Sequence, residues 1–242
     1  MSEGGAIEVE AISLAIIIPT LNAADGLRDT LHALSVPTPG MRVDVIVVDG
    51  GSTDETLDIA QRFGARIAVA DGGRGPQLAE GARHGFGDWL FFLHADTQPP
   101  PDWPAQILAF TKLDGAVDKA AYFQLRLDDS APAARRVERF VAWRARVLGL
   151  AYGDQGLVLS RRLYERVGGY PHVALMEDVA LIRRIAQASG RKNLVALGGY
   201  ARTSAARYRK SGYSRRGARN LVCLGLYFLG VPPRVIARLY RG

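Results

Sequence analysis

The sequence predicts an α/β protein with a Rossmann-like, mainly parallel sheet flanked by helices. One observation is that short runs rich in β-branched or aromatic residues, such as Val45–Val48 and Leu90–Leu93, alternate with segments of helical apolar spacing. Such runs are typical of buried parallel strands. The other is that these two runs lead directly to Asp49 and Asp96. Because functional side chains gather beyond the carboxyl ends of strands in an open α/β sheet, the two carboxylates predict a site at that edge.

Four β-then-α units are expected in the first half of the chain, which implies right-handed crossovers between parallel strands. The expected strands are 12–18, 43–48, 66–70 and 89–93, and the expected helices are 27–34, 55–63, 77–85 and 104–112. Asp25 is well placed to cap the first of these helices.

After the prolines at 99–101 the alternation loosens. Strands are expected over 121–127 and 156–159, and helices over 133–150 and 179–188. No internal repeat or low-complexity linker divides the chain. We therefore expect one domain over 12–205, with a short tail at 1–11 and a basic amphipathic helical tail at 206–242.

The composition fits this organisation. The chain has 242 residues, of which 48% are hydrophobic, enough for a sizeable core. The single cysteine, Cys223, excludes an internal disulfide and fits a reducing compartment. Residues 1–11 contain no basic segment of the kind that opens a secretory signal. The apolar run at 221–231 is about half of the ~20 residues that cross a bilayer. These features predict a cytoplasmic protein.

The basic charge is concentrated at the end of the chain. Residues 201–242 hold 10 Lys+Arg and no Asp or Glu, whereas residues 1–200 hold 21 basic and 24 acidic residues, a net charge of −3. On a helical wheel Arg234, Arg238 and Arg241 lie opposite the apolar side chains of the same segment. Two interpretations stay open: reversible contact with an anionic surface at the inner face of the membrane, or packing on the domain or on a second subunit in a homodimer. No nucleic-acid motif accompanies the charge, so no nucleic-acid partner is expected.

The first candidate site lies where the first two strands end, at Pro19-Thr20-Leu21-Asn22 and Asp49-Gly50-Gly51-Ser52. Gly50 lets a planar ligand approach the backbone closely. Asp49 caps no obvious helix and could accept a hydrogen bond from a base imide or a ribose hydroxyl. Asp54, by contrast, is more readily interpreted as a helix cap.

His94 and Asp96 form a second candidate site, because strand residues two apart project to the same side. Imidazole and carboxylate donors suit Mg²⁺ or Mn²⁺, with nucleotide phosphates as further ligands. Arg74 could pair with a diphosphate, although taken alone it is more readily interpreted as a solvated loop residue.

The third candidate is the pair Glu177 and Asp178 at the start of a predicted helix. Adjacent acids there could complement the helix dipole or supply a general base for an acceptor hydroxyl. The loop Gly153–Gly156 would line the same pocket. No Ser/His/Asp nucleophile set, Cys/His metal cluster, P-loop or GxGxxG motif is evident.

Together these segments resemble the family 2 glycosyltransferases, which have the GT-A fold. The matching elements are IIIPTLN, VIVVDGGSTD, GRGPQLAEGAR, LFFLHADT, YGDQGLVLSRRLYERVGGYP and MEDVALIRRI, in that order. The chain further resembles one bacterial subgroup of this family, which is associated with radical-SAM, selenium or arsenosugar gene neighbourhoods. This resemblance rests on three segments: HAD in place of DxD, GDQG and TSAARYRKSG.

The resemblance implies a donor such as a UDP- or GDP-sugar, a hydroxyl acceptor that could be lipid-linked, and Mn²⁺ or Mg²⁺ as cofactor. It implies metal binding by Asp96, with His94 near the metal or ribose, and catalysis by Asp178 as base with Glu177 beside it. The nucleotide-sugar side would comprise Pro19, Thr20, Asn22, Asp49, Gly50, Ser52, Arg74, Gln77 and Ala95. The diphosphate or acceptor side would comprise Gln155, Arg207 and Arg209.

The expected function is therefore inverting, metal-dependent transfer of a sugar from a nucleoside-diphosphate sugar to a hydroxyl. His94 and Ala23 stand where the family carries acids, and Glu80 stands where many members carry Asn. These departures motivate an alternative, a catalytically impaired nucleotide-sugar-binding or membrane-docking protein of the same fold. A nucleotidyltransferase is less favoured, because the first strand is not followed by a glycine-rich nucleotide loop.

Overall fold

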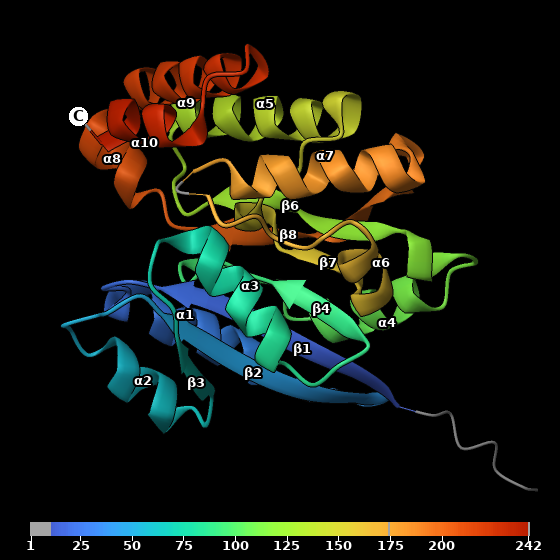
Figure 1. The fold of residues 1–242 in the computed structure, drawn as a ribbon. Coiled ribbons are helices and arrows are strands. Elements are labelled where there is room, and N and C mark those ends of the chain that lie inside the picture. Colours follow the sequence, from blue (N-terminus) through green and yellow to red (C-terminus); the bar gives the residue numbers. More distant parts are fainter. Residues whose placement is uncertain (1–10, 174, 242) are drawn as a thin grey trace, which may run out of the picture.

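An eight-stranded sheet forms the centre of the computed structural model, which describes residues 11–173 and 175–241 (Figure 1). The strands are β1 (Ile12–Thr20), β2 (Met41–Asp49), β3 (Arg66–Val69), β4 (Trp89–Phe92), β5 (Thr97–Gln98), β6 (Ala120–Leu127), β7 (Leu157–Ser160) and β8 (Leu194–Thr203). Their order is β3-β2-β1-β4-β7-β6-β8-β5. Pairing is parallel except for β7 with both of its neighbours and β5 with β8, so the predicted mainly parallel sheet is confirmed.

The helices alternate with the strands in the first half of the chain, as predicted. They are α1 (Ala24–Leu34), α2 (Thr56–Arg62), α3 (Arg74–His84), α4 (Trp103–Thr111), α5 (Pro132–Leu148), α6 (Arg161–Arg166), α7 (Glu177–Ser189), α8 (Ala206–Ser211), α9 (Tyr213–Phe228) and α10 (Pro233–Arg241). Parallel pairing of β1 with both β2 and β4 aligns the carboxyl ends of these strands.

The hydrophobic core lies on both faces of the sheet. Alternate residues of β1 divide between the two layers, with Leu14, Ile16 and Ile18 on one side and Ala15 and Ile17 on the other, all fully buried. The first layer is completed by α1 and α4, the second by α3, α6 and α7. Complete burial of a side chain of this size contributes roughly 1.5–3 kcal/mol. The central strands are therefore held rigidly, and so are the loops at their ends.

Two details of the sequence-based prediction were wrong. Asp25 does not cap α1, because the N-cap is Ala23 and the N–H of Ala24 donates to Asp54 Oδ2 at 3.1 Å. Strand β8 was missed, since its burial alternates irregularly and Gly198-Gly199 interrupts its apolar pattern. It pairs in parallel with β6 and extends the sheet toward β5.

The carboxy-terminal helices form a further layer beside the long helix α5, at the top of Figure 1. Helix α9 contacts both α5 and α10, and Cys223 and Ile236 are buried there. Of the alternatives for this segment, packing on the domain is thus observed for α9. The domain boundary at 205/206 stays a prediction, and most of the predicted tail at 1–11 lies outside the described residues. No described helix has the length and apolar character needed to span a bilayer.

Candidate active site

Asp49 anchors the turn that follows β2. Its Oδ1 accepts hydrogen bonds from the Thr20 hydroxyl at 2.9 Å and the Ser52 hydroxyl at 2.6 Å. Its Oδ2 accepts from the backbone N–H groups of Gly51 and Ser52 at 2.9 and 2.7 Å. Burial opposes ionisation, but these bonds lower the pKa of the carboxyl below 3.8. Asp49 therefore has a structural task in this turn, and a ligand donor would have to share an oxygen that already accepts twice.

The neighbouring turn after β1 is tied to the same loop. Asn22 adopts a left-handed backbone, with φ 48°. Its N–H donates to Ser52 Oγ at 2.8 Å, and its Oδ1 accepts from the N–H of Thr53 at 2.9 Å. Asp54 Oδ1 accepts from the N–H of Thr56, the first residue of α2, at 3.0 Å, but the N-cap of that helix is Glu55, one residue after the expected position.

Gln77 joins the ends of β1 and β2 from within. Its Nε2 donates to the carbonyls of Thr20 at 2.6 Å and Val48 at 2.9 Å, and the side chain is buried. A Cβ at Gly50 would lie 2.9 Å from this Nε2, so the glycine permits the close approach. Gln77 thus supports the two strand ends, as does the buried Pro19 in β1.

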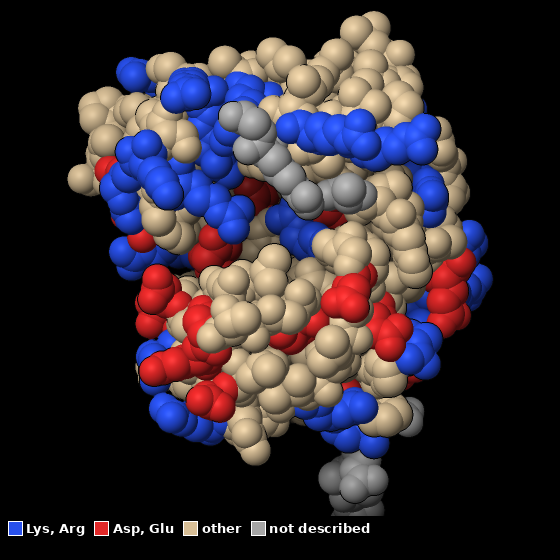
Figure 2. Space-filling view, turned by 60° about the vertical axis from the view of Figure 1, so that its left-hand side comes forward, with Lys and Arg blue, Asp and Glu red and all other residues tan. Residues whose placement is uncertain are grey.

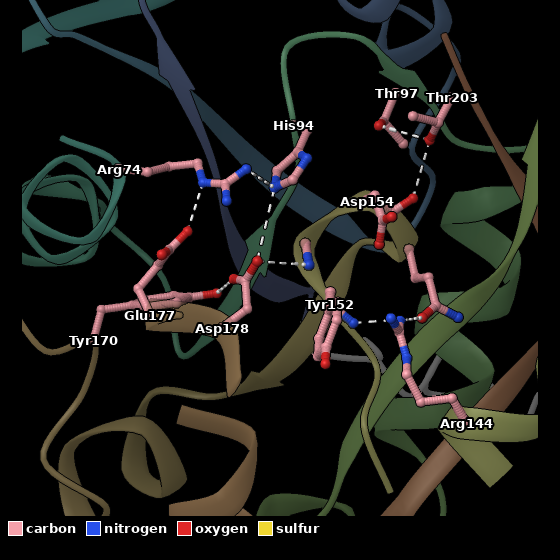
Figure 3. Close-up of polar contacts among 12 residues, drawn as sticks. Arg74, His94, Thr97, Arg144, Tyr152, Asp154, Tyr170, Glu177, Asp178 and Thr203 are labelled. Carbon is pink, nitrogen blue, oxygen red and sulfur yellow. Dashed lines mark hydrogen bonds and ion pairs between the residues drawn. The ribbon is translucent and has the colours of Figure 1, made fainter. Parts of the chain in front are cut away.

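Across the sheet edge, five polar side chains form one network (Figure 3): Arg74, His94, Tyr170, Glu177 and Asp178. Arg74, the first residue of α3, pairs with Glu177 Oε1 at 2.6 Å and places Nη1 3.1 Å from His94 Nε2. His94 Nε2 in turn lies 3.9 Å from Asp178 Oδ2. The interpretation of Arg74 as a solvated loop residue is therefore wrong. The first turn of α7 brings in both acids, which are buried.

The two acids of this network are held differently. Burial raises the pKa of Glu177, while Arg74 lowers it and Asp178 raises it further. Asp178 instead accepts from the Tyr170 hydroxyl at 3.0 Å through Oδ1 and from the N–H of Gly153 at 3.2 Å through Oδ2. Burial, then Asp178, raises the pKa of Tyr170 well above 10.0, so the phenol remains a donor. Glu177 is committed to an ion pair, whereas Asp178 is oriented by two neutral donors.

The surroundings of His94 favour the neutral form of its imidazole. Burial and the adjacent Arg74 lower the pKa of the imidazole, against the opposing effects of Asp178 and Asp96. Arginine can only donate, so Nε2 accepts and the proton of the neutral ring lies on Nδ1. Neither nitrogen then offers a free lone pair. This geometry does not favour the expected role of His94 as a metal ligand.

The loop that carries Gly153 closes over the network. It forms a short 3₁₀ helix, η2 (Gly153–Gln155), in which Gln155 is completely buried. Gln155 Nε2 donates to the carbonyl of Phe123 at 3.2 Å, and its Oε1 accepts from Arg144 at 3.4 Å. Gln155 therefore fixes the loop from the inside. The carbonyl of Asp154 accepts from the Thr203 hydroxyl at 3.0 Å, which links the loop to β8 (Figure 3).

Oxygen donors suitable for a metal lie just beyond β4. The Asp96 side chain is partly exposed, and the backbone around it is fixed because the carbonyls of Ala95 and Asp96 accept from Thr30 at 2.9 Å and Ser204 at 3.1 Å. Asp154 Oδ1 is buried without a hydrogen-bond partner in the described structure. Among residues 11–173 and 175–241 no group of three potential metal ligands occurs. Proteins usually bind Mg²⁺ and related ions through one or two carboxylates, and substrate phosphates complete the coordination. The carboxylates of Asp96 and Asp154 fit such an ion.

Two predicted diphosphate residues lie outside this network. Arg209 pairs with Asp128 at 3.3 Å and Asp129 at 3.8 Å, and Arg207 is exposed on α8. Conversely, no periodic pattern predicted Tyr170 or Gly153, since the former lies in an irregular segment and the latter in the short 3₁₀ helix η2. The Gly-Asp-Gln-Gly cluster was the only hint that a backbone N–H would face Asp178.

The residue that precedes the acidic pair has an unusual backbone. Met176, the N-cap of α7, has φ 68°, in the left-handed region. Beside it, a Cβ on Gly75 would lie 2.5 Å from the carbonyl of Pro171. The start of α3 and the approach to α7 are thus packed as closely as their backbones allow, which brings Arg74 onto Glu177.

Comparison with known proteins identifies the family. The family model for glycosyl transferase family 2 matches residues 15–166. A PGL/p-HBAD biosynthesis glycosyltransferase of Mycobacterium bovis is 43% identical over 89 residues, 34% of each chain. The undecaprenyl-phosphate 4-deoxy-4-formamido-L-arabinose transferase of Klebsiella pneumoniae is 26% identical over 166 residues, 63% of this chain and 49% of that protein. The chain thus spans about a third to a half of the length of the curated relatives that it matches.

Solved structures share the fold. A mannosyltransferase from Pyrobaculum calidifontis in complex with GDP-Man and Mn²⁺ superposes with a TM-score of 0.66 at 18% identity, covering 96% of this chain and 68% of that one. The glucosyl-3-phosphoglycerate synthase of Mycobacterium tuberculosis, in complex with Mn²⁺, UDP and glucosyl-3-phosphoglycerate, gives 0.64 at 19% identity, covering 96% and 87%. The GT-A fold is thereby confirmed, and the chain belongs to glycosyl transferase family 2.

Proposed function

We propose that this protein transfers a sugar from a nucleoside-diphosphate sugar to an acceptor hydroxyl, with inversion at the anomeric carbon. The observation that carries the proposal is the setting of Asp178, whose carboxylate is oriented by Tyr170 and Gly153 and lies 3.9 Å from His94 Nε2. A base must be held in a fixed direction toward the proton that it removes. Glu177 is less suited to this role, because its carboxylate is already engaged in the ion pair with Arg74.

In the proposed reaction, Asp178 accepts the proton of the acceptor hydroxyl as its oxygen forms a bond to the anomeric carbon. The bond from that carbon to the diphosphate breaks, and the leaving diphosphate keeps the electron pair. Attack from the face opposite the leaving group gives inversion. Holding donor and acceptor in this alignment supplies much of the acceleration.

A divalent metal is proposed as cofactor, with Asp96 as its protein ligand and the free oxygen of Asp154 as a second candidate. Such an ion would neutralise charge on the departing diphosphate. Mn²⁺ is favoured because the structural neighbours are described as complexes with it, and Mg²⁺ is the alternative. Figure 2 shows a face that is hollowed at its middle, with Lys and Arg gathered along the upper rim and Asp and Glu below, so the upper rim is the side proposed for the anionic diphosphate.

We place the nucleotide against the turns of Asn22 and Asp49, at the carboxyl ends of β1 and β2. Both turns are fixed by their own hydrogen bonds, so they offer a preformed wall to a UDP or GDP moiety. Gly50 and Ser52 belong to the same wall. Arg207, on the exposed side of α8, is the better candidate of the two late arginines for a diphosphate, because Arg209 is already paired.

The acceptor is proposed to be a hydroxyl compound at the inner membrane face, in keeping with the basic end of the chain. Assignment to the radical-SAM- or selenium-associated subgroup rests on the HAD and GDQG segments. A homodimer is the competing explanation for the exposed carboxy-terminal surface.

The deciding experiment measures donor hydrolysis and transfer with Mn²⁺ for Asp178→Asn, Asp96→Ala and a matched control, Asp58→Asn at an exposed position of α2. Asp178→Asn should abolish turnover while donor binding by calorimetry persists. Asp96→Ala should weaken both, and the control should retain activity. Wild-type turnover by Asp178→Asn would refute its role as base. Donor binding by the native chain with no turnover across a broad acceptor panel would favour the non-catalytic alternative.

A further inference from the structure

The outer surface of α5, α9 and α10 combines features that the proposed chemistry does not use. Helix α9 lies beside both α5 and α10 and forms the outermost layer with them, at the top of Figure 1. We call this the α5–α9–α10 surface. It consists of the exposed residues Arg136, Arg139, Phe140, Trp143, Arg146 and Val147 on α5, Arg215, Leu221, Val222, Phe228 and Leu229 on and after α9, and Arg234, Val235, Arg238 and Leu239 on α10.

Large apolar side chains are concentrated on this surface. On α5, Phe140 and Trp143 are 39% and 49% exposed and contact one another at 5.9 Å between ring centroids. After α9, Leu229 is 82% exposed. Isolated exposed apolar residues need no explanation, but a pair of contacting aromatic rings, with further exposed apolar residues on the neighbouring helices, is typical of an interaction surface.

The charge of the surface is of one sign. Its exposed arginines recur at helical spacing between the apolar residues, for example Arg136, Arg139 and Arg146 on α5. The only acid in the three helices is Glu138, which is bound to Arg135 at 2.6 Å and to the N–H of Leu127 at 2.8 Å. The surface therefore presents cations and hydrocarbon together, with no exposed anion among its described residues.

We infer that the α5–α9–α10 surface docks on an anionic lipid bilayer, lying in the plane of the interface. Aromatic side chains favour the headgroup boundary, and arginines favour acidic headgroups. A second copy of the chain fits less well, because a self-complementary contact would oppose arginine to arginine without an acid between them. The inference deepens the proposed function: it gives the acceptor a location and extends membrane contact from the tail to α5.

Trp143 provides a direct reporter. The other two tryptophans, Trp89 and Trp103, are 6% and 0% exposed, whereas Trp143 is 49% exposed. Vesicles of phosphatidylcholine with phosphatidylglycerol should shift the tryptophan emission of the full chain to shorter wavelength, and pure phosphatidylcholine should not. High salt should reverse the shift, and Trp143→Phe should remove it while retaining co-sedimentation.

Two paired variants test the surface itself. Phe140→Ser with Trp143→Ser, and separately Arg136→Gln with Arg139→Gln, should each weaken co-sedimentation with anionic vesicles by roughly tenfold or more. The matched controls are Phe86→Ser, which is 71% exposed elsewhere, and Arg62→Gln on α2, and both should bind as the native chain does. Donor hydrolysis without vesicles should be unchanged in all four.

Equal recovery with neutral and anionic vesicles, or unaltered binding by both surface variants, would overturn the inference. So would a native dimer in light scattering that Trp143→Ser dissociates, since the surface would then join two chains. A chain that binds vesicles but transfers no sugar would refute only the proposed function. One that transfers sugar but does not bind vesicles would refute only the docking surface.

Discussion

Replacing Gly153 with alanine tests whether the contact between the η2 loop and the His94–Asp178 pair sets the catalytic geometry. The backbone at this residue is outside the left-handed region, so alanine can adopt it. The added Cβ would lie 2.5 Å from His94 Nε2 and 3.3 Å from Asp178 Oδ2. An ordinary van der Waals contact begins at 3.4 Å, so the new Cβ and His94 Nε2 would have to move apart by about 0.9 Å, the difference between 3.4 and 2.5 Å.

That displacement cannot be absorbed locally. The His94 ring is held 3.1 Å from Arg74, and the Gly153 N–H is itself a donor to Asp178. Misplacement of a reacting group by about 1 Å can lower the rate ~100-fold, and overpacking of a buried site costs about 1–3 kcal/mol. We therefore expect kcat to fall ~100-fold, with the free energy of unfolding reduced by about 1–3 kcal/mol.

The assay is steady-state sugar transfer with Mn²⁺, paired with urea denaturation. Gly217→Ala is the control, because this glycine lies within α9 with nothing near its added Cβ. Alanine there should raise the free energy of unfolding by up to about 1 kcal/mol and leave kcat unchanged. If Gly153→Ala retained kcat within about threefold of the native value, the loop would not position the base and the reasoning from Cβ contact would be wrong.

Three further predictions concern two neighbours of this pair, Arg74 and Tyr170, and the Asp49 turn. Arg74→Met should lower the free energy of unfolding by about 3 kcal/mol, the low end for a broken buried pair, because Arg74 is 36% exposed. The double variant Arg74→Met, Glu177→Gln should recover most of this loss in denaturation curves, because no unpaired carboxylate then remains buried. Tyr170→Phe should cost about 1.5–3 kcal/mol in the same measurement, because Asp178 Oδ1 loses its donor; an unchanged midpoint would show that water replaces the phenol. The lowered pKa of Asp49 means that its ionised form stabilises the fold above pH 3.8 and that this contribution is lost as pH falls below 3.8. Asp49→Asn should therefore flatten the acid limb of the profile of unfolding free energy against pH, and an unaltered limb would contradict this account.

The sequence predicted the parallel half of the sheet because that half is encoded locally. Residues 14–18 and 45–48 are continuous apolar runs, and strands buried on both faces require such runs. Strand β8 was missed because its pairing partner, β6, lies far away in the chain and its two glycines weaken the strand pattern.

The site was only partly predictable for a related reason. Strand-end residues such as Asp49 and Asp96 could be placed by position alone. The partners of Asp178 could not, because a tyrosine and a glycine N–H carry no periodic signal and meet the acid only through packing. The same packing gives Gln77 and Gln155 supporting roles, since their amides bond to buried carbonyls of neighbouring strands.

The left-handed backbone of Met176 has a consequence for how this protein could be made more robust. A non-glycine residue in that conformation carries a penalty of roughly 1–2 kcal/mol, and the packing of the Met176 side chain against the second core layer offsets it. Glycine at 176 would relieve the strain but lose that packing, and it would loosen the backbone that holds the first turn of α7 and its acidic pair. A screen for heat resistance therefore gains little at this position, whereas the direction of the acidic pair depends on it.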